Sequence, residues 1–169
     1  MPDRVVAATL AIGPGSTVRE VVEVAQVVLD VEEAPWSSRL QGVCAVLWQA
    51  RPSLVSASLY APDPPGIRLV LAAHQGGPVA LTVPWHEGLV GTAAADRVVQ
   101  IVPLLRMFHG HRLDNPAAQS AVAVPVTRPG VLAVLVLLAP ERDAFTPVEV
   151  EMVQQVAEQA AQRWPSQGH

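Results

Sequence analysis

The chain has 169 residues, of which 50% are hydrophobic and 15% are charged, and its formal net charge is −4. That length favours one domain, and the apolar content is enough for a packed core, so extensive disorder is excluded. The 11 basic residues, all Arg, are scattered and form no basic stretch. Since nucleic-acid binding needs a clustered positive surface, we expect no nucleic-acid partner.

The cysteine count and the hydropathy pattern indicate in which cellular compartment the protein is expected. Cys44 is the only cysteine, which excludes an intramolecular disulfide and a cysteine-based zinc cluster. The longest apolar run, residues 131–139, is shorter than the about 20 residues that span a bilayer. The N-terminus does not have the layout of a cleavable signal peptide. We therefore expect a soluble, cytoplasmic protein with no membrane partner.

The first 15 residues are predicted to form an N-terminal arm. They end in Gly13-Pro14-Gly15, a sequence that breaks regular structure. Residues 4–12 fit either a short strand or an ordered arm. A single domain is then expected over residues 16–164, followed by a C-terminal tail at 165–169.

Two helices are predicted at the start of this domain. Thr17 and Glu20 have the spacing of a capping box, which begins a helix over 17–34. Its apolar face is wider than one core contact requires, so we expect this helix to pack also against a second copy of the chain. A second helix, over 37–50, has apolar residues at helical spacing. Cys44 lies within that apolar stripe and is interpreted as a structural residue.

Strands are predicted in the middle of the chain. Residues 55–60 alternate apolar and polar side chains, which is typical of a half-buried strand. The last two predicted strands are apolar at nearly every position, as central strands covered on both faces are. The predicted strands lie at 55–60, 67–74, 79–84, 98–102, 121–126 and 131–138.

The last helix has a specific start signal. Thr146 and Glu149 form a second capping box, and Pro147 occupies the first helical position. This helix is predicted over 146–164. Helices at both ends and strands between them indicate an α+β fold, in which about six mainly antiparallel strands form a central sheet and the N- and C-terminal helices lie on one face.

Two connecting segments carry the candidate binding residues. Residues 84–95 predict a tight loop that enters a short helix, because glycine tolerates strained dihedral angles and alanine favours helix. Residues 104–119 are the least regular part of the chain and hold many polar groups. Loops on a rigid scaffold are where small molecules usually bind, so residues 84–95 are a candidate binding segment.

The order of these elements resembles that of a GAF domain, over roughly residues 35–164. Within that superfamily the chain is most similar to the free methionine-(R)-sulfoxide reductases. The segments that carry the resemblance are PWHEGLVGTAAA, SAVAVPV and VLAVLVLLAPERDAFTPVEVEMVQQVAEQAA. The more specific similarities are Gln75-Gly76-x-Pro78, Gly88-x-x-Gly91-Thr92-Ala93-Ala94, Phe108-x-Gly110-His111, Gln119-Ser120 and Val124-Pro125.

The resemblance also implies which chemistry is missing. The reductases attack the sulfoxide sulfur with a cysteine thiolate and resolve the oxidised form with further cysteines. Their three cysteine positions correspond here to Ala80, Val90 and Asp114. Their acidic positions, which hold the substrate ammonium group, correspond approximately to Ala121, Val136 and Leu138. Of the aromatic pair on the first strand, Ser56 replaces the Trp and Tyr60 matches the Tyr.

We therefore expect a non-catalytic GAF module for small-molecule binding in signalling, or for homodimerisation through the terminal helices, with no cofactor and no metal. A filled pocket in a purely dimerising domain is the alternative within this class. The second class is an enzyme or metal-binding protein that uses His109, His111 and Asp114. The candidate pocket residues are Tyr60, Trp85, His86, Thr92, His109, His111 and Asp114.

Overall fold

A six-stranded antiparallel sheet forms the centre of the computed structural model, which describes residues 2–64, 66–108 and 115–166. The strands are β1 (Ser56–Pro62), β2 (Arg68–Gly76), β3 (Thr82–Pro84), β4 (Gln100–Val102), β5 (Ser120–Thr127) and β6 (Val131–Ala139). Their order in the sheet is β3-β2-β1-β6-β5-β4, and every neighbouring pair is antiparallel. The predicted α+β class and six-stranded sheet are confirmed.

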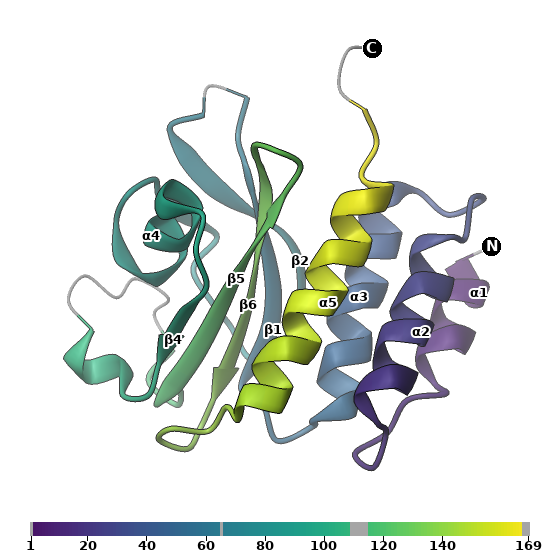
Figure 1. The fold of residues 1–169 in the computed structure, drawn as a ribbon, viewed down its shortest axis with the longest axis horizontal. Coiled ribbons are helices and arrows are strands. Elements are labelled where there is room, and N and C mark those ends of the chain that lie inside the picture. The colour runs from purple at the N-terminus through teal and green to yellow at the C-terminus, as the bar shows by residue number, and fades with distance from the viewer. Residues whose placement is uncertain (1, 65, 109–114, 167–169) are drawn as a thin grey trace.

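The terminal helices cover one face of the sheet, as predicted (Figure 1). Helices α3 (Trp36–Ala50) and α5 (Pro147–Arg163) pack directly on the strands. Helix α2 (Val18–Leu29) packs over α3 and α5, and α1 (Pro2–Thr9) packs over α2 and α3. Helix α4 (Gly88–Asp96) lies on the opposite face, and the short 3-10 helix η1 spans Leu105–Met107. Within the described chain, no helix has the length and apolar character needed to span a membrane.

Both predicted capping boxes are present. The Thr17 hydroxyl accepts a hydrogen bond from the Glu20 backbone N–H at 3.1 Å, and the Glu20 carboxylate accepts one from the Thr17 N–H at 3.0 Å. Thr146 and Glu149 make the same pair of bonds, both at 3.2 Å, at the start of α5. Each box satisfies N–H groups that the first helical turn leaves without an intrahelical partner.

Residues 2–9 form helix α1, so of the two alternatives left open for residues 4–12 the short strand was wrong. Val5 is buried, and the Arg4 guanidinium is paired with Glu33. A short apolar run fits a strand or a helix equally well by its pattern alone. Packing against α2 and α3 selects the helix here, and the first residues become an outer layer of the helical side.

The expectation that β1 would be half-buried was also wrong. Ala57 and Leu59 face the helical core, but Ser56, Ser58 and Tyr60 on the other face are buried as well. The strand lies between β2 and β6, and on its second face Tyr60 packs in the apolar cluster that also contains residues of α4. Alternating polarity therefore indicates two differently filled faces in this strand and not a solvent-exposed side.

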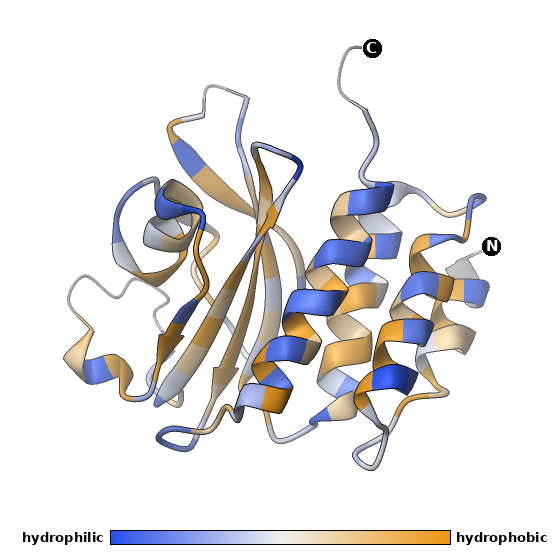
Figure 2. Cartoon of the chain, in the orientation of Figure 1, coloured by the Kyte–Doolittle hydropathy of each residue, from blue (hydrophilic) through white to orange (hydrophobic). Residues whose placement is uncertain are grey.

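Apolar side chains on the two faces of the sheet form two clusters. Figure 2 shows that the central strands consist mainly of hydrophobic residues. The larger cluster joins the sheet to α1, α2, α3 and α5, and it contains Cys44. The smaller cluster lies between the sheet and α4; we call it the α4-side cluster. Its buried members are Tyr60, Leu69, Val83, Leu89, Val90, Ala93, Ala94, Val102, Leu105, Ala121, Ala123, Val134, Val136 and Leu138.

The wide apolar face of α2 is used inside the chain. Helices α1, α3 and α5 all contact α2. The buried residues of the helix are Val21, Val22, Ala25, Val28 and Leu29. The wide apolar face of α2 suggested a contact with a second copy of the chain. Its width is explained by contacts with three helices of the same chain.

Candidate functional site

The turn that enters α4 is shaped by two backbone constraints. His86 and Gly88 both have positive φ angles, of 73° and 66°. Gly91 lies so close to the end of β3 that a Cβ atom at this position would be 2.2 Å from the carbonyl oxygen of Pro84. Only glycine permits that approach. The glycines of this segment thus bring α4 down onto the sheet and close one end of the α4-side cluster.

Two of the predicted pocket residues join this cluster. Tyr60 is fully buried in it, and its hydroxyl donates a 2.6 Å hydrogen bond to the backbone oxygen of Ala80. Trp85 packs against the cluster from the turn before α4. Tyr60 therefore links the central strand β1 to the segment that precedes β3.

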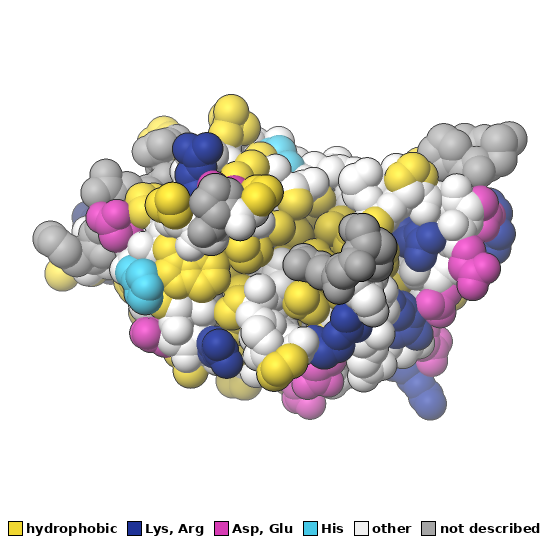
Figure 3. All heavy atoms as spheres, turned by 90° about the horizontal axis from the view of Figure 1, so that it is seen from above, with side chains coloured by type: hydrophobic (Ala, Val, Ile, Leu, Met, Phe, Trp, Pro, Cys, Tyr) yellow, Lys and Arg dark blue, Asp and Glu magenta, His cyan; other side chains and the backbone are white. Residues whose placement is uncertain are grey.

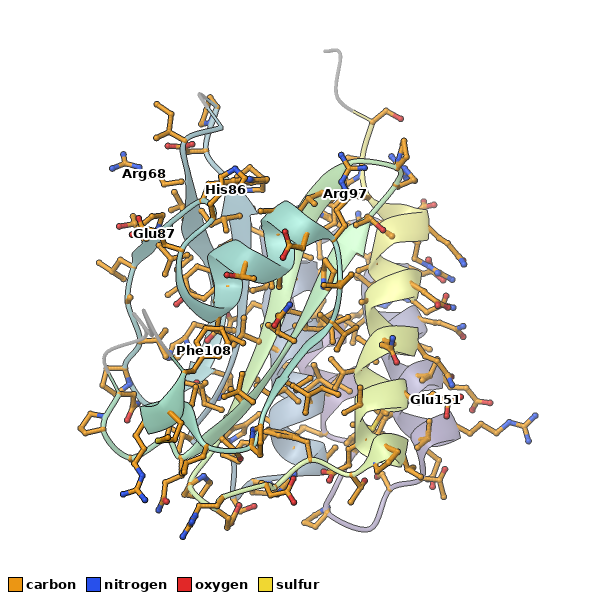
Figure 4. All side chains as sticks on the ribbon, turned by 60° about the vertical axis from the view of Figure 1, so that its left-hand side comes forward. Arg68, His86, Glu87, Arg97, Phe108 and Glu151 are labelled. Carbon is orange, nitrogen blue, oxygen red and sulfur yellow. The ribbon has the colours of Figure 1, made fainter. Side chains whose placement is uncertain are left out.

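The remaining predicted residues lie differently. His86 is exposed, and its ring meets the Trp85 ring edge-on, with centroids 6.4 Å apart. Figure 4 shows His86 and Glu87 together in the turn at the start of α4. Thr92 is partly buried on α4. His109, His111 and Asp114 lie outside the described residues, and so does the histidine–aspartate alternative built on them.

A serine–histidine contact that the sequence analysis missed lies on the same sheet face as Tyr60. The Oγ atom of Ser58 is 2.8 Å from Nδ1 of His74, and Nε2 of His74 is 3.2 Å from the carbonyl oxygen of Gly76. Ser58 and His74 are direct partners in the β1–β2 register. The sequence signal for this contact is the alternation of apolar and polar residues in β1 together with the pairing of β1 and β2 in a hairpin. That pairing places the side chains of Ser58 and His74 on one face.

Asn115 is a second residue that the sequence analysis did not select. It is buried, and its side-chain amide donates a 2.7 Å hydrogen bond to the backbone oxygen of Pro78. Its Oδ1 atom accepts a 3.1 Å bond from the N–H of Ala117. Asn115 thus fastens the end of the loop that precedes β5 to the loop that follows β2.

The single thiol of the chain lies across the sheet from the α4-side cluster. Cys44 lies in α3, fully buried in the helical core. Burial raises the pKa of the Cys44 thiol to about 12. Because the thiolate is the nucleophilic form, a thiol that stays protonated and has no access to solvent is unreactive.

The strands beneath α4 are uncharged. Strands β1, β5 and β6 contain no Asp, Glu, Lys or Arg. Ala121, Val136 and Leu138 are fully buried members of the α4-side cluster. An ammonium group placed on this part of the sheet would therefore meet hydrocarbon and not a carboxylate. Within the described ranges, no three His, Cys, Asp or Glu side chains are close enough to hold a metal ion.

Two surface hollows lie away from this face. One, of about 370 Å³, lies between α1, α3 and the end of β2, with Val5, Thr9 and Gly42 among its lining residues. The other, of about 490 Å³, lies between the β1–β2 turn, the start of β6 and Trp164. Figure 3 views that end of the molecule, where apolar side chains gather. Neither hollow is lined by the predicted pocket residues.

Comparison with known proteins agrees with this architecture. Protein YtsP of Bacillus subtilis is 29% identical over 115 residues, which cover 68% of this chain and 71% of YtsP. The free methionine-R-sulfoxide reductase of Neisseria meningitidis, solved with its substrate, superposes with a TM-score of 0.80 at 23% identity and covers 86% of this chain and 87% of its own. A candidate GAF sensor protein from Burkholderia vietnamiensis also has a TM-score of 0.80, at 22% identity, with 86% and 92% covered.

The two solved structures establish a shared fold, which occurs both in reductases and in proteins of the sensor class. The GAF domain family itself matches residues 16–163, nearly the whole chain. That match begins after α1 and ends at the last residue of α5. The chain therefore belongs to the GAF domain family.

Proposed function

We propose that this GAF domain is a non-catalytic module that binds a small molecule on the α4 side of its sheet. One observation carries the proposal: this face of the sheet holds the buried hydroxyl groups of Ser56, Ser58 and Tyr60, with the partly buried imidazole of His74 beside Ser58, next to the otherwise apolar α4-side cluster. Small-molecule sites typically combine an apolar lining with a few convergent polar groups. The helical face of the same sheet also holds a buried hydroxyl, that of Ser120, but this group is hydrogen-bonded to the backbone of Glu141 and Ala144.

The absence of catalysis is inferred from the placement of the thiol and from the two described reductase positions. Val90 is buried in the α4-side cluster, and Ala80 contributes only its backbone oxygen to Tyr60. Cys44 is separated from both by the sheet. Sulfoxide reduction by a thiol needs an accessible thiolate beside the substrate, and no described residue supplies one.

A thermal-shift screen tests the binding function. The panel holds methionine and its sulfoxides, other amino acids, cyclic nucleotides, small carboxylic acids and divalent metal ions. A ligand at about 100 times its dissociation constant stabilises the folded state by about 2.7 kcal/mol, which raises the melting temperature by several degrees. A flat panel with a cooperative melting transition would overturn ligand binding and favour a purely dimerising domain.

We also propose a homodimer formed through the helical side. The supporting observation is a set of apolar side chains that α1 and α2 leave exposed. Val6, in the middle of α1, is 56% exposed, Leu10, just after its end, is 69% exposed, and Val27 on α2 is 53% exposed. Apolar patches on the surface of a soluble domain are characteristic of interaction sites.

A further inference from the structure

Strand β1 presents three hydroxyl groups in a row toward the α4 side. Ser56, Ser58 and Tyr60 occupy alternate positions, so their side chains share one face. All three are buried, with 0%, 1% and 0% of their surface exposed. The Tyr60 hydroxyl is bonded to Ala80 and the Ser58 hydroxyl contacts His74. We call these three residues the hydroxyl row.

The Ser56 hydroxyl differs from the other two, because it has no hydrogen-bond partner in the described part of the chain. A buried polar group left unpaired costs about 1–3 kcal/mol, and proteins rarely retain one without a purpose. Ser56 pairs with Gly76 of β2 on one side and with Leu138 of β6 on the other. Its side chain is therefore a buried donor among uncharged neighbours.

The next pair along the row contains a group that can acquire charge. Nε2 of His74 faces the Gly76 carbonyl oxygen, which can only accept, so Nε2 carries a hydrogen. In the neutral ring Nδ1 is then an acceptor, and the Ser58 hydroxyl donates to it. When the ring is protonated, Nδ1 also carries a hydrogen and donates to the Ser58 oxygen. The Ser58 proton is then available to another acceptor.

Protonation of His74 would thus change the character of the row. Ser56 and Ser58 would both offer a hydroxyl proton, and an imidazolium would lie one hydrogen bond away. Two donors and a nearby positive charge suit an anionic oxygen group. The apolar side chains of Val136 and Leu138, from the adjacent strand β6, would contact the hydrocarbon part of such a ligand.

We propose that the hydroxyl row binds the carboxylate of a small organic acid, and that binding is coupled to proton uptake by His74. This inference rests on the proposed ligand-binding function. The strands under the site hold no carboxylate that could pair with an ammonium group, so an amine is disfavoured. The proposed ligand is therefore bound through a negatively charged carboxylate, whereas a substrate held through its ammonium group is bound through a positive charge.

The surroundings of His74 are uncharged among the described residues that bond to it. Ser58 comes from β1, and the carbonyl of Gly76 comes from β2 itself. From α3, the Gln41 side chain bonds to the backbone N–H and carbonyl of His74. Tyr60 is the titratable side chain next to Ser58 on the same face of β1. The imidazole of His74 is therefore the group in this set that gains a positive charge on protonation.

The test uses the ¹⁵N-labelled full chain and three probes that share a 3-methylbutyl group: 4-methylpentanoate, 4-methylpentanamide and 3-methylbutylamine. Acetate, butanoate, benzoate and succinate extend the series of acids. Backbone amide shifts and the His74 ring signals are followed by NMR at pH 5.5 and pH 7.5. We expect at least one acid to bind, about tenfold or more tightly than an amide or amine of matching size, because only the carboxylate matches the charged donor set.

Because binding is proposed to be coupled to proton uptake by His74, linkage requires a higher affinity for the acid at pH 5.5 than at pH 7.5. Ser56→Ala and His74→Gln should each weaken binding about tenfold, and His74→Gln should also abolish the pH dependence. The matched control is Ser53→Ala, which removes an exposed serine hydroxyl outside the hydroxyl row and should leave the affinity unchanged.

Three results would overturn the inference: no binding by any acid, equal binding of the amide, or an affinity that neither variant changes. These results differ from failure of the proposed function. If another compound of the thermal-shift panel binds while the acids do not, the domain binds ligands but the carboxylate assignment is wrong. If nothing binds in either experiment, the ligand-binding function fails as well.

Discussion

The hydroxyl group of Tyr60 and the backbone oxygen of Ala80 are joined by a hydrogen bond of 2.6 Å that connects the centre of the sheet to its edge segment. The bond satisfies a polar group at the end of a side chain that is otherwise fully buried. It also holds the segment between β2 and β3, which has few backbone bonds of its own; among them is the bond from Leu71 to Leu81.

Tyr60→Phe should therefore destabilise the fold while leaving the ring packed. We expect a loss of about 1–2 kcal/mol in the free energy of unfolding, because the Ala80 carbonyl loses its donor in a buried place. Equilibrium urea unfolding of the variant and the wild type measures the difference. An unchanged midpoint would mean that water replaces the phenol at no cost.

Ser56→Ala and Ser58→Ala form a matched pair on one face of β1, and we expect opposite outcomes. Ser58→Ala leaves Nδ1 of His74 without its partner and should cost about 1 kcal/mol or more. Ser56→Ala removes a buried hydroxyl that has no described partner, so the ligand-free domain should keep or slightly gain stability. Equal destabilisation in urea unfolding would show that Ser56 is hydrogen-bonded in the free protein.

Cys44 should make the stability of the domain fall at alkaline pH. Burial raises the pKa of its thiol from 9.0 to about 12, so the folded state favours the protonated form. The protonated thiol makes its full contribution to the free energy of unfolding at pH values below the pKa of Cys44 in the unfolded chain. That contribution is lost as the pH rises from about 9 to 12. Cys44→Ala creates a small cavity and should be less stable than the wild type at pH 7, but the difference should narrow at pH 10.

Unfolding measured at both pH values for both proteins checks this expectation. The thiol should also fail to react with a disulfide reagent in the native state and react fully in denaturant. Rapid native-state modification would show that α3 opens or that Cys44 is accessible, and it would remove the basis for an inert thiol.

Much of the fold could be predicted because local signals and global packing agree. The capping boxes at Thr17 and Thr146 began helices where predicted. The end of α2 was missed: the helix stops at Leu29, and Arg39, from the next helix, donates to the backbone oxygens of Leu29, Glu32 and Ala34. A cap supplied by a residue ten positions away in the sequence has no local signature.

The site was less predictable, because it depends on register. Tyr60 and Trp85 could be selected as aromatic residues beside the expected pocket, and both join the α4-side cluster. The Ser58–His74 pair required the pairing of β1 with β2, which includes an irregularity between Leu59 and Tyr60. A shift of one residue moves a side chain to the other face, so the pair could not be recognised without the register.

The homodimer proposal gives a direct expectation for mutants of the helical side. Light scattering at micromolar concentration should give twice the chain mass of 17.9 kDa for the wild type. Leu10→Glu should shift the protein toward the monomer, because burying an unpaired carboxylate in an apolar interface is costly. The control is Ile67→Glu, an equally exposed apolar residue just before β2, which should not change the mass. A monomeric wild type would refute the dimer.

The reductase reaction itself should be absent. We expect no dithiol-dependent reduction of free methionine-R-sulfoxide above a blank, with the Neisseria meningitidis enzyme as the positive control. The reason is geometric as well as chemical: Cys44 is buried on the helical side of the sheet, and the strands beneath α4 carry no charge to hold an ammonium group. Turnover that disappears in Cys44→Ala would mean that this thiol reaches the substrate. Turnover that persists in that variant would require a nucleophile other than a cysteine of this chain, because the chain has no second cysteine.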